Sequence, residues 1–143
     1  MLKVNHVAVA VTALAAFVFS SLYYSPLFLG NVWLAVDPTS TAGMKPSIGR
    51  VFAELARTLV ITYVLARLIL LLGGKDWKGG VGIALGMWFG FSFMMWVGAI
   101  MWENTPWPVA AIHTGDWLVK TVLIAFMLGV WRDRSIKHGN EQY

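Results

Sequence analysis

The sequence contains no cysteine, and this absence excludes two kinds of structure. A chain without cysteine forms no disulfide bonds and offers no thiolate ligands to zinc or to an iron–sulfur cluster. Charged residues are also scarce, at 13% of the chain, where an average soluble protein has about a quarter. Apolar residues make up 58% of the 143 residues instead. This composition indicates a membrane protein.

The apolar residues form four long segments, each near the roughly 20 residues that a helix needs to cross a bilayer. We expect an all-α membrane protein with a single domain over residues 1–143, an up-and-down bundle of four transmembrane helices. A cytoplasmic tail is expected over residues 132–143. The four predicted helices cover residues 4–29, 48–72, 79–102 and 108–131.

The basic residues predict the orientation of this bundle. With four spans, both termini share one side of the membrane with the turn over residues 73–78. The other side has only Lys45 and Arg50. Because lysine and arginine favour the cytoplasmic side, we expect both termini in the cytoplasm and no nucleic-acid partner, despite the net charge of +4. The basic residues on the predicted cytoplasmic side are Lys3, Lys75, Lys78, Arg132, Arg134 and Lys137.

Two of the apolar segments contain ionisable residues where lipid hydrocarbon is expected. Glu54 and Arg57 lie in the second segment, and His113, Asp116 and Lys120 lie in the fourth. Both groups begin at a similar depth from the outer end of their helix, and each follows one helical face. We therefore expect the two groups to meet, with Arg57 paired to Asp116 and Glu54 paired to His113 or Lys120.

Two interpretations of this polar cluster remain open. In the first, the charges only lock the helices together, and removing one partner costs about 3–5 kcal/mol. In the second, the cluster lines a cavity open to the outer side that binds a polar or anionic ligand or relays protons. The position of Lys120 near mid-membrane, where its ammonium group is far from water, favours the second interpretation.

Small residues recur at every fourth position in three of the segments, a spacing that lets helices approach closely. The pattern fits tight packing inside one bundle, a contact between two copies of the chain or a mobile helix, and we expect the first. The residues are Ala8, Thr12, Ala16 and Ser20; Gly82, Gly86 and Gly90; and Thr121, Ala125 and Gly129.

Enzymatic and cofactor-binding motifs are missing from the sequence. It has no glycine-rich phosphate loop, no nucleophile elbow and no metalloprotease helix motif. His6 and His113 are predicted at opposite depths, so they cannot share a metal, and we expect no cofactor. An intramembrane enzyme that uses His113 and Asp116 as acid and base stays as a further alternative.

A Tyr-Tyr-Ser-Pro sequence stands near the end of the first apolar segment. Pro26 lacks a backbone donor and disfavours helical geometry at Ser25, so the helix should kink or end there. The hydroxyl groups of Tyr23, Tyr24 and Ser25 then lie at the outer interface or complete the wall of the polar cluster.

Residues 23–33 resemble a motif of the domain-of-unknown-function family numbered 1761, which reads aromatic-Tyr-Ser-Pro and then aromatic, Gly and Trp. Here Phe28, Gly30 and Trp33 follow Pro26, and His113 matches a polar, histidine-containing stretch early in the last helix. The general layout is similar over the full length. The resemblance implies a four-span fold in a bacterial membrane and implies no activity.

The sequence thus predicts a small integral protein of the bacterial inner membrane whose partners are the lipid bilayer and either further copies of itself or a larger membrane complex. One hypothesis is a ligand-binding or transport-type protein acting through the polar cluster. The alternative is an accessory or structural subunit.

Overall fold

The computed structural model describes residues 4–37, 46–74 and 76–140, with side chains described as far as Arg132. Within these ranges every regular element is helical. The elements α4, η1 (a π-helical segment) and α5 run on as one helix from Trp77 to Trp102. Counted in this way, the described ranges contain five helices. The elements are α1 (His6–Tyr23), α2 (Gly30–Val36), α3 (Ile48–Leu71), α4 (Trp77–Met87), η1 (Trp88–Phe93), α5 (Met94–Trp102) and α6 (Trp107–Asn140).

Three of these helices are long and apolar enough to cross a membrane: His6–Tyr23, Trp77–Trp102 and Trp107–Arg132. The predicted second span, α3, has the necessary length at 24 residues but is more highly charged. It carries Arg50, Glu54, Arg57 and Arg67. The prediction of an all-α protein is therefore confirmed, and three of its helices could span a membrane.

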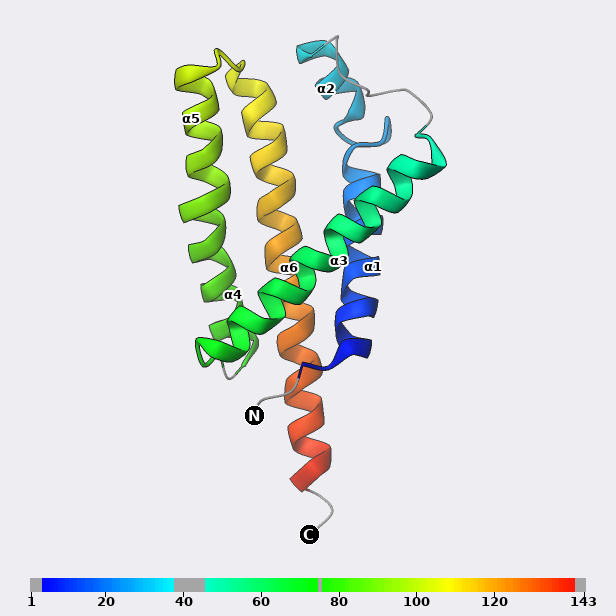
Figure 1. Cartoon of the computed structure of the whole chain (residues 1–143), viewed down its shortest axis with the longest axis vertical. Coiled ribbons are helices and arrows are strands. Elements are labelled where there is room, and N and C mark those ends of the chain that lie inside the picture. Colours follow the sequence, from blue (N-terminus) through cyan, green and yellow to red (C-terminus); the bar gives the residue numbers. More distant parts are fainter. Residues whose placement is uncertain (1–3, 38–45, 75, 141–143) are drawn as a thin grey trace.

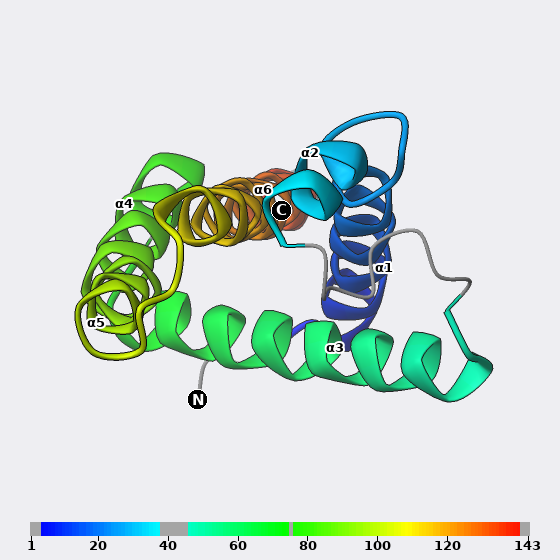
Figure 2. The same ribbon diagram turned by 90° about the horizontal axis from the view of Figure 1, so that it is seen from above.

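The long helices alternate in direction along the chain (Figure 1). Seen from above, α1 and α6 are viewed nearly end-on, whereas α3 is viewed broadside, so α3 is steeply inclined across one side of the bundle (Figure 2). The inclination lets α3 reach from α1 at one end to α4 at the other. The apolar core where these helices meet consists of Ala16, Leu65, Ile69, Ala84, Ile124 and Ala125.

The first helix ends at Tyr23 rather than near residue 29, and the chain turns at Pro26 as its missing donor predicts. Backbone N–H groups of Phe28 and Gly30 both donate to the carbonyl of Ser25, at 3.0 and 2.9 Å, and close the turn. A Cβ atom at Gly30 would lie 2.5 Å from the carbonyl oxygen of Tyr24, so the turn requires glycine there. The short helix α2 follows, inside the stretch predicted to be a connection.

The last helix also differs from its prediction, because α6 does not end at residue 131 but continues to Asn140. Most of the predicted tail is therefore helical. Lys3, Lys45 and Lys75 lie outside the described residues, as do residues 38–44 of the turn-rich connection and the side chains of Arg134 and Lys137. The predicted orientation of the bundle stays a prediction.

Small residues pack inside the bundle on α1 and α6. The four on α1 are all buried, and Thr121 and Ala125 of α6 are buried as well. Gly129 of α6 lies against the backbone of Trp77, where a Cβ atom would overlap the Trp77 Cα and stand 2.8 Å from its Cβ. For these two helices the expected packing is confirmed.

The glycines of α4 and η1 behave differently. A Cβ atom added at Gly82, Gly86 or Gly90 would meet nothing within 4 Å. The expectation that these glycines pack inside one bundle is therefore wrong, since this face points away from the other helices.

Candidate functional site

The ionisable residues of α3 and α6 meet in the half of the molecule where α1 ends and α6 begins. Lys120 is fully buried, and its Nζ atom lies 3.6 Å from Glu54 Oε1 and 3.4 Å from Asp116 Oδ2. Asp116 is itself only 2% exposed. Lys120 thus connects the carboxylates of two helices. Its contact with Glu54 is one of the two alternatives predicted for Glu54.

The second predicted pairing is corrected by the geometry. Arg57 does not bond to Asp116 but donates from Nε and Nη2 to the two carboxylate oxygens of Glu54, both at 2.8 Å. The two residues stand three positions apart on α3, which places them on the same helical face. Because this ion pair is bidentate, the Nε and Nη2 donors of Arg57 are used within α3 and not for a bond to Asp116 of α6.

Asp116 is held from the opposite side by α1. The hydroxyl of Ser20 donates to Asp116 Oδ1 over 2.6 Å, and both residues are buried. Asp116 therefore connects α1, through Ser20, with the lysine of its own helix and with Glu54 beyond it. Three helices share this buried network.

His113 occupies an aromatic enclosure and makes no ion pair with Glu54, which corrects the remaining predicted pairing. Its Nδ1 atom is 2.8 Å from the hydroxyl of Tyr24. The Trp96 ring stacks on the imidazole at 5.0 Å between centroids with an interplanar angle of 8°, and the Trp33 ring meets it edge-on at 5.3 Å. Histidine is thus packed between rings from α1, α2 and α5.

Tyr23 and Ser25, both expected as cavity walls, point elsewhere. The Tyr23 hydroxyl donates to the carbonyl oxygen of Ile112 at 3.0 Å, passing so close to Gly115 that a Cβ atom there would stand 2.7 Å from it. The Ser25 hydroxyl donates to the carbonyl oxygen of Leu22 at the exposed turn. Of the three hydroxyl residues in the motif, only Tyr24 lines the cavity described next.

A cavity of about 520 Å³ lies beside this network and is called the cluster cavity below. Its wall combines ionisable groups with aromatic rings contributed by five helices. The ring of Trp117 also makes cation–π contacts with two basic side chains. The guanidinium carbon of Arg57 and the Nζ of Lys120 each lie 5.5 Å from its ring centroid. The lining residues are Ser20, Ser21, Tyr24, Trp33, Glu54, Arg57, Met95, Trp96, His113, Asp116 and Trp117.

The sequence left open whether Trp88, Trp96 and Trp117 face lipid or line a pocket, and it did not predict Ser20, Ser21, Trp33 or Met95 as wall residues. Trp96 is reached only because the π-helical segment η1 shifts the register of the helix that carries it, and the Trp88 indole anchors the start of that segment by donating to the Thr114 carbonyl at 3.0 Å. Trp33 lies in a helix that the sequence predicted as a connection. Ser20 carried a signal, because it belongs to the small-residue face of α1 and lies one turn before Tyr24.

Metal binding finds no support in this part of the molecule, since the described residues contain no group of three histidine or carboxylate side chains close enough to hold an ion. An arginine, an imidazole and three indole rings surround a space of small-molecule size.

Comparison with known proteins identifies a family and nothing closer. No curated protein and no solved structure matches the chain. A family model described as a protein of unknown function (DUF1761) matches residues 7–129. This range includes the Tyr-Tyr-Ser-Pro motif and every side chain of the cluster cavity. The chain therefore belongs to the DUF1761 family, as the motif following the first helix predicted.

Proposed function

We propose that this protein binds a small anionic solute in the cluster cavity and acts as a ligand-binding or transport-type membrane protein. The observation that carries the proposal is the half-exposed guanidinium of Arg57 on the wall of a cavity of about 520 Å³. Pockets that hold small molecules commonly measure about 300–1,000 Å³. The cavity is thus large enough for a ligand, and it contains a cation that a ligand can reach.

The wall supports an anion that also carries an apolar or aromatic part. Glu54 occupies the Nε and Nη2 atoms of Arg57, which leaves the Nη1 donors for a ligand. Lys120 is fully buried and serves the two carboxylates instead. The indoles of Trp33, Trp96 and Trp117 offer flat surfaces beside the charge.

This function includes α3 as the fourth membrane span. Its 24 residues suffice to cross the hydrocarbon core even when inclined. Two of its charged side chains, Glu54 and Arg57, face the cluster cavity rather than lipid, which lowers the cost of placing them inside the membrane. With both termini cytoplasmic, as the count of basic residues predicts, the cavity belongs to the outer half of the bundle.

Binding of radiolabelled benzoate to the purified full-length protein tests the proposal, because benzoate combines a carboxylate with an aromatic ring. We expect benzoate to bind more tightly than uncharged benzyl alcohol. An Arg57→Gln variant should bind benzoate about tenfold more weakly, since it loses a charge-assisted hydrogen bond. The matched control is Arg50→Gln, an exposed arginine of α3 outside the cavity wall, which should bind as the unmodified protein does.

The proposal fails if benzoate and benzyl alcohol bind alike, or if Arg57→Gln and Arg50→Gln give the same affinity. Helical content and elution volume in detergent show whether each variant is folded, so that lost binding is not confused with lost structure.

The second candidate function is that of an accessory subunit whose charges only lock helices. It is favoured by one observation, the complete burial of Lys120 between the carboxylates of α3 and α6. Under this function Arg57→Gln would destabilise the fold as strongly as Asp116→Asn. Under the first function, only the Asp116 variant has a large effect on stability.

A further inference from the structure

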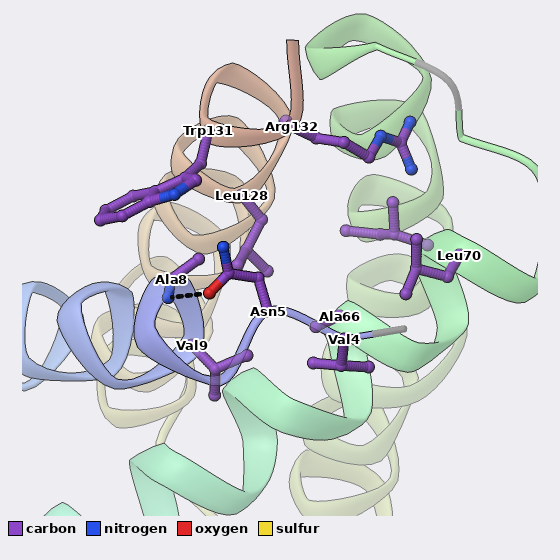
Figure 3. A pocket seen from close by; sticks show the side chains of 11 residues that line it. Val4, Asn5, Ala8, Val9, Ala66, Leu70, Leu128, Trp131 and Arg132 are labelled. Atoms are coloured by element: carbon purple, nitrogen blue, oxygen red, sulfur yellow. Dashed lines mark hydrogen bonds between the residues drawn. The ribbon is translucent and has the colours of Figure 1, made fainter. Parts of the chain in front are cut away.

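A second cavity, of about 260 Å³, lies at the opposite end of the bundle, where α1 begins and α3 ends (Figure 3). It is independent of the cluster cavity and shares no residue with it. Most of its wall is apolar and comes from α1, α3 and α6. The apolar and aromatic side chains around it include Ala8, Val9, Ala66, Leu70, Leu128 and Trp131.

Two hydrogen-bond donors interrupt this apolar wall. The Nη2 atom of Arg132 is buried and has no hydrogen-bond partner among the described residues. Asn5 uses its Oδ1 atom to accept from the backbone N–H of Ala8 at 3.0 Å, and Figure 3 shows its amide nitrogen on the side of Leu128. None of the described residues that line the cavity is acidic. As far as the described side chains show, the cavity therefore offers positive charge and donors with no acidic group beside them.

The level of the cavity in the molecule decides what can fill it. In the sequence of α6 the apolar stretch ends at Trp131, just before Arg132, while α1 begins at His6 and α3 ends at Leu71. All three helices thus reach the boundary between hydrocarbon and headgroups here, with the donors at the boundary and the apolar wall below it. A buried guanidinium donor without a partner is costly, so an anion from this layer has an energetic reason to enter.

We propose that this cavity binds an anionic phospholipid. The phosphate accepts hydrogen bonds from Arg132 and from the Asn5 amide, and the first part of an acyl chain lies along Leu70 and Leu128. Basic pockets between membrane helices at the headgroup level are known lipid sites for the same physical reason. A free phosphate would satisfy the two donors but would leave the apolar wall uncovered.

Lipid retention by the delipidated full-length protein, measured by native mass spectrometry, tests the proposal. Phosphatidylglycerol and phosphatidylcholine with identical acyl chains are the probes. We expect phosphatidylglycerol to be retained preferentially, an Arg132→Gln variant to lose about five- to tenfold of that preference, and Arg132→Lys to keep most of it. Arg67→Gln removes the same charge from an exposed position of α3 outside the cavity and should change nothing.

An Asn5→Asp variant keeps the proposal testable if Arg132→Gln does not fold. Aspartate preserves the acceptor that caps α1, removes the amide donor and adds a negative charge, so the preference for phosphatidylglycerol should fall. Equal retention of the two lipids by the unmodified protein would overturn the proposal, as would an unchanged preference in the folded variants. Displacement of phosphatidylglycerol by an equal concentration of glycerol 3-phosphate would assign the site to a free phosphate ester instead.

Discussion

Replacing Lys120 by methionine removes a fully buried positive charge and leaves Asp116, which is 2% exposed, without its ionic partner. Breaking a buried ion pair from one side costs about 3–5 kcal/mol, because the remaining charge keeps its desolvation cost. Glu54 still has Arg57, so the stranded charge is that of Asp116. We expect the free energy of unfolding to fall by that amount in Lys120→Met and by somewhat less in Asp116→Asn, because Lys120 then keeps the Glu54 carboxylate at 3.6 Å.

The double variant Lys120→Met with Asp116→Asn gives the decisive comparison, since it removes both charges together. Its loss should be smaller than the sum of the two single losses by about 2 kcal/mol, a coupling typical of groups in contact. The measurement is the free energy of unfolding in mixed micelles titrated with sodium dodecyl sulfate, followed by circular dichroism. Single losses below about 1 kcal/mol, or losses that add within about 0.5 kcal/mol, would refute the reasoning. Arg57→Gln is the control: its side chain is 49% exposed, and it should cost no more than about 1 kcal/mol.

Two further predictions use matched pairs of residues and the same unfolding measurement. Ser20→Ala removes a 2.6 Å hydrogen bond to a buried carboxylate and should cost about 1.5–3 kcal/mol, whereas Ser21→Ala removes only an exposed bond to its own helix and should cost less than about 0.5 kcal/mol. Gly129→Ala should destabilise the protein because its Cβ would overlap the backbone of Trp77, whereas Gly86→Ala has open space and should be neutral or stabilising. Equal effects within either pair would contradict the packing described here.

The sequence predicted which ionisable residues come together, because apolar segments and helical spacing determine both depth and face. It did not predict their partners. Arg57 could pair with Glu54 on its own helix or with Asp116 on α6. Which carboxylate it bonds depends on the inclination of α3, and hydropathy does not encode that inclination. Pairing between neighbouring helices is therefore a property of packing that the pattern of one helix does not contain.

The sequence did not predict Trp33 as part of the cavity wall and left open whether Trp96 faces lipid or a pocket, for two separate reasons. Trp33 stands in α2, a seven-residue helix in a stretch rich in turn-forming residues, and its contact with His113 depends on the turn at Pro26. Trp96 reaches the same imidazole from beyond η1. The turn at Pro26 itself was predictable, because proline acts locally through its missing donor.

The π-helical segment makes the number of residues between Trp88 and Trp96 matter as much as their identity. Each residue of an α-helix advances the side-chain direction by about 100°. A π-helical turn accommodates one extra residue, so α-helical geometry over residues 88–93 at their present number would leave the Trp88 anchor on Thr114 in place but turn Trp96 by roughly that angle, away from His113. Converting this segment to an α-helix without removing a residue would therefore take the stacked indole away from the imidazole, even though every ring that surrounds it would still be encoded, whereas deleting one residue at the same time would keep the stack.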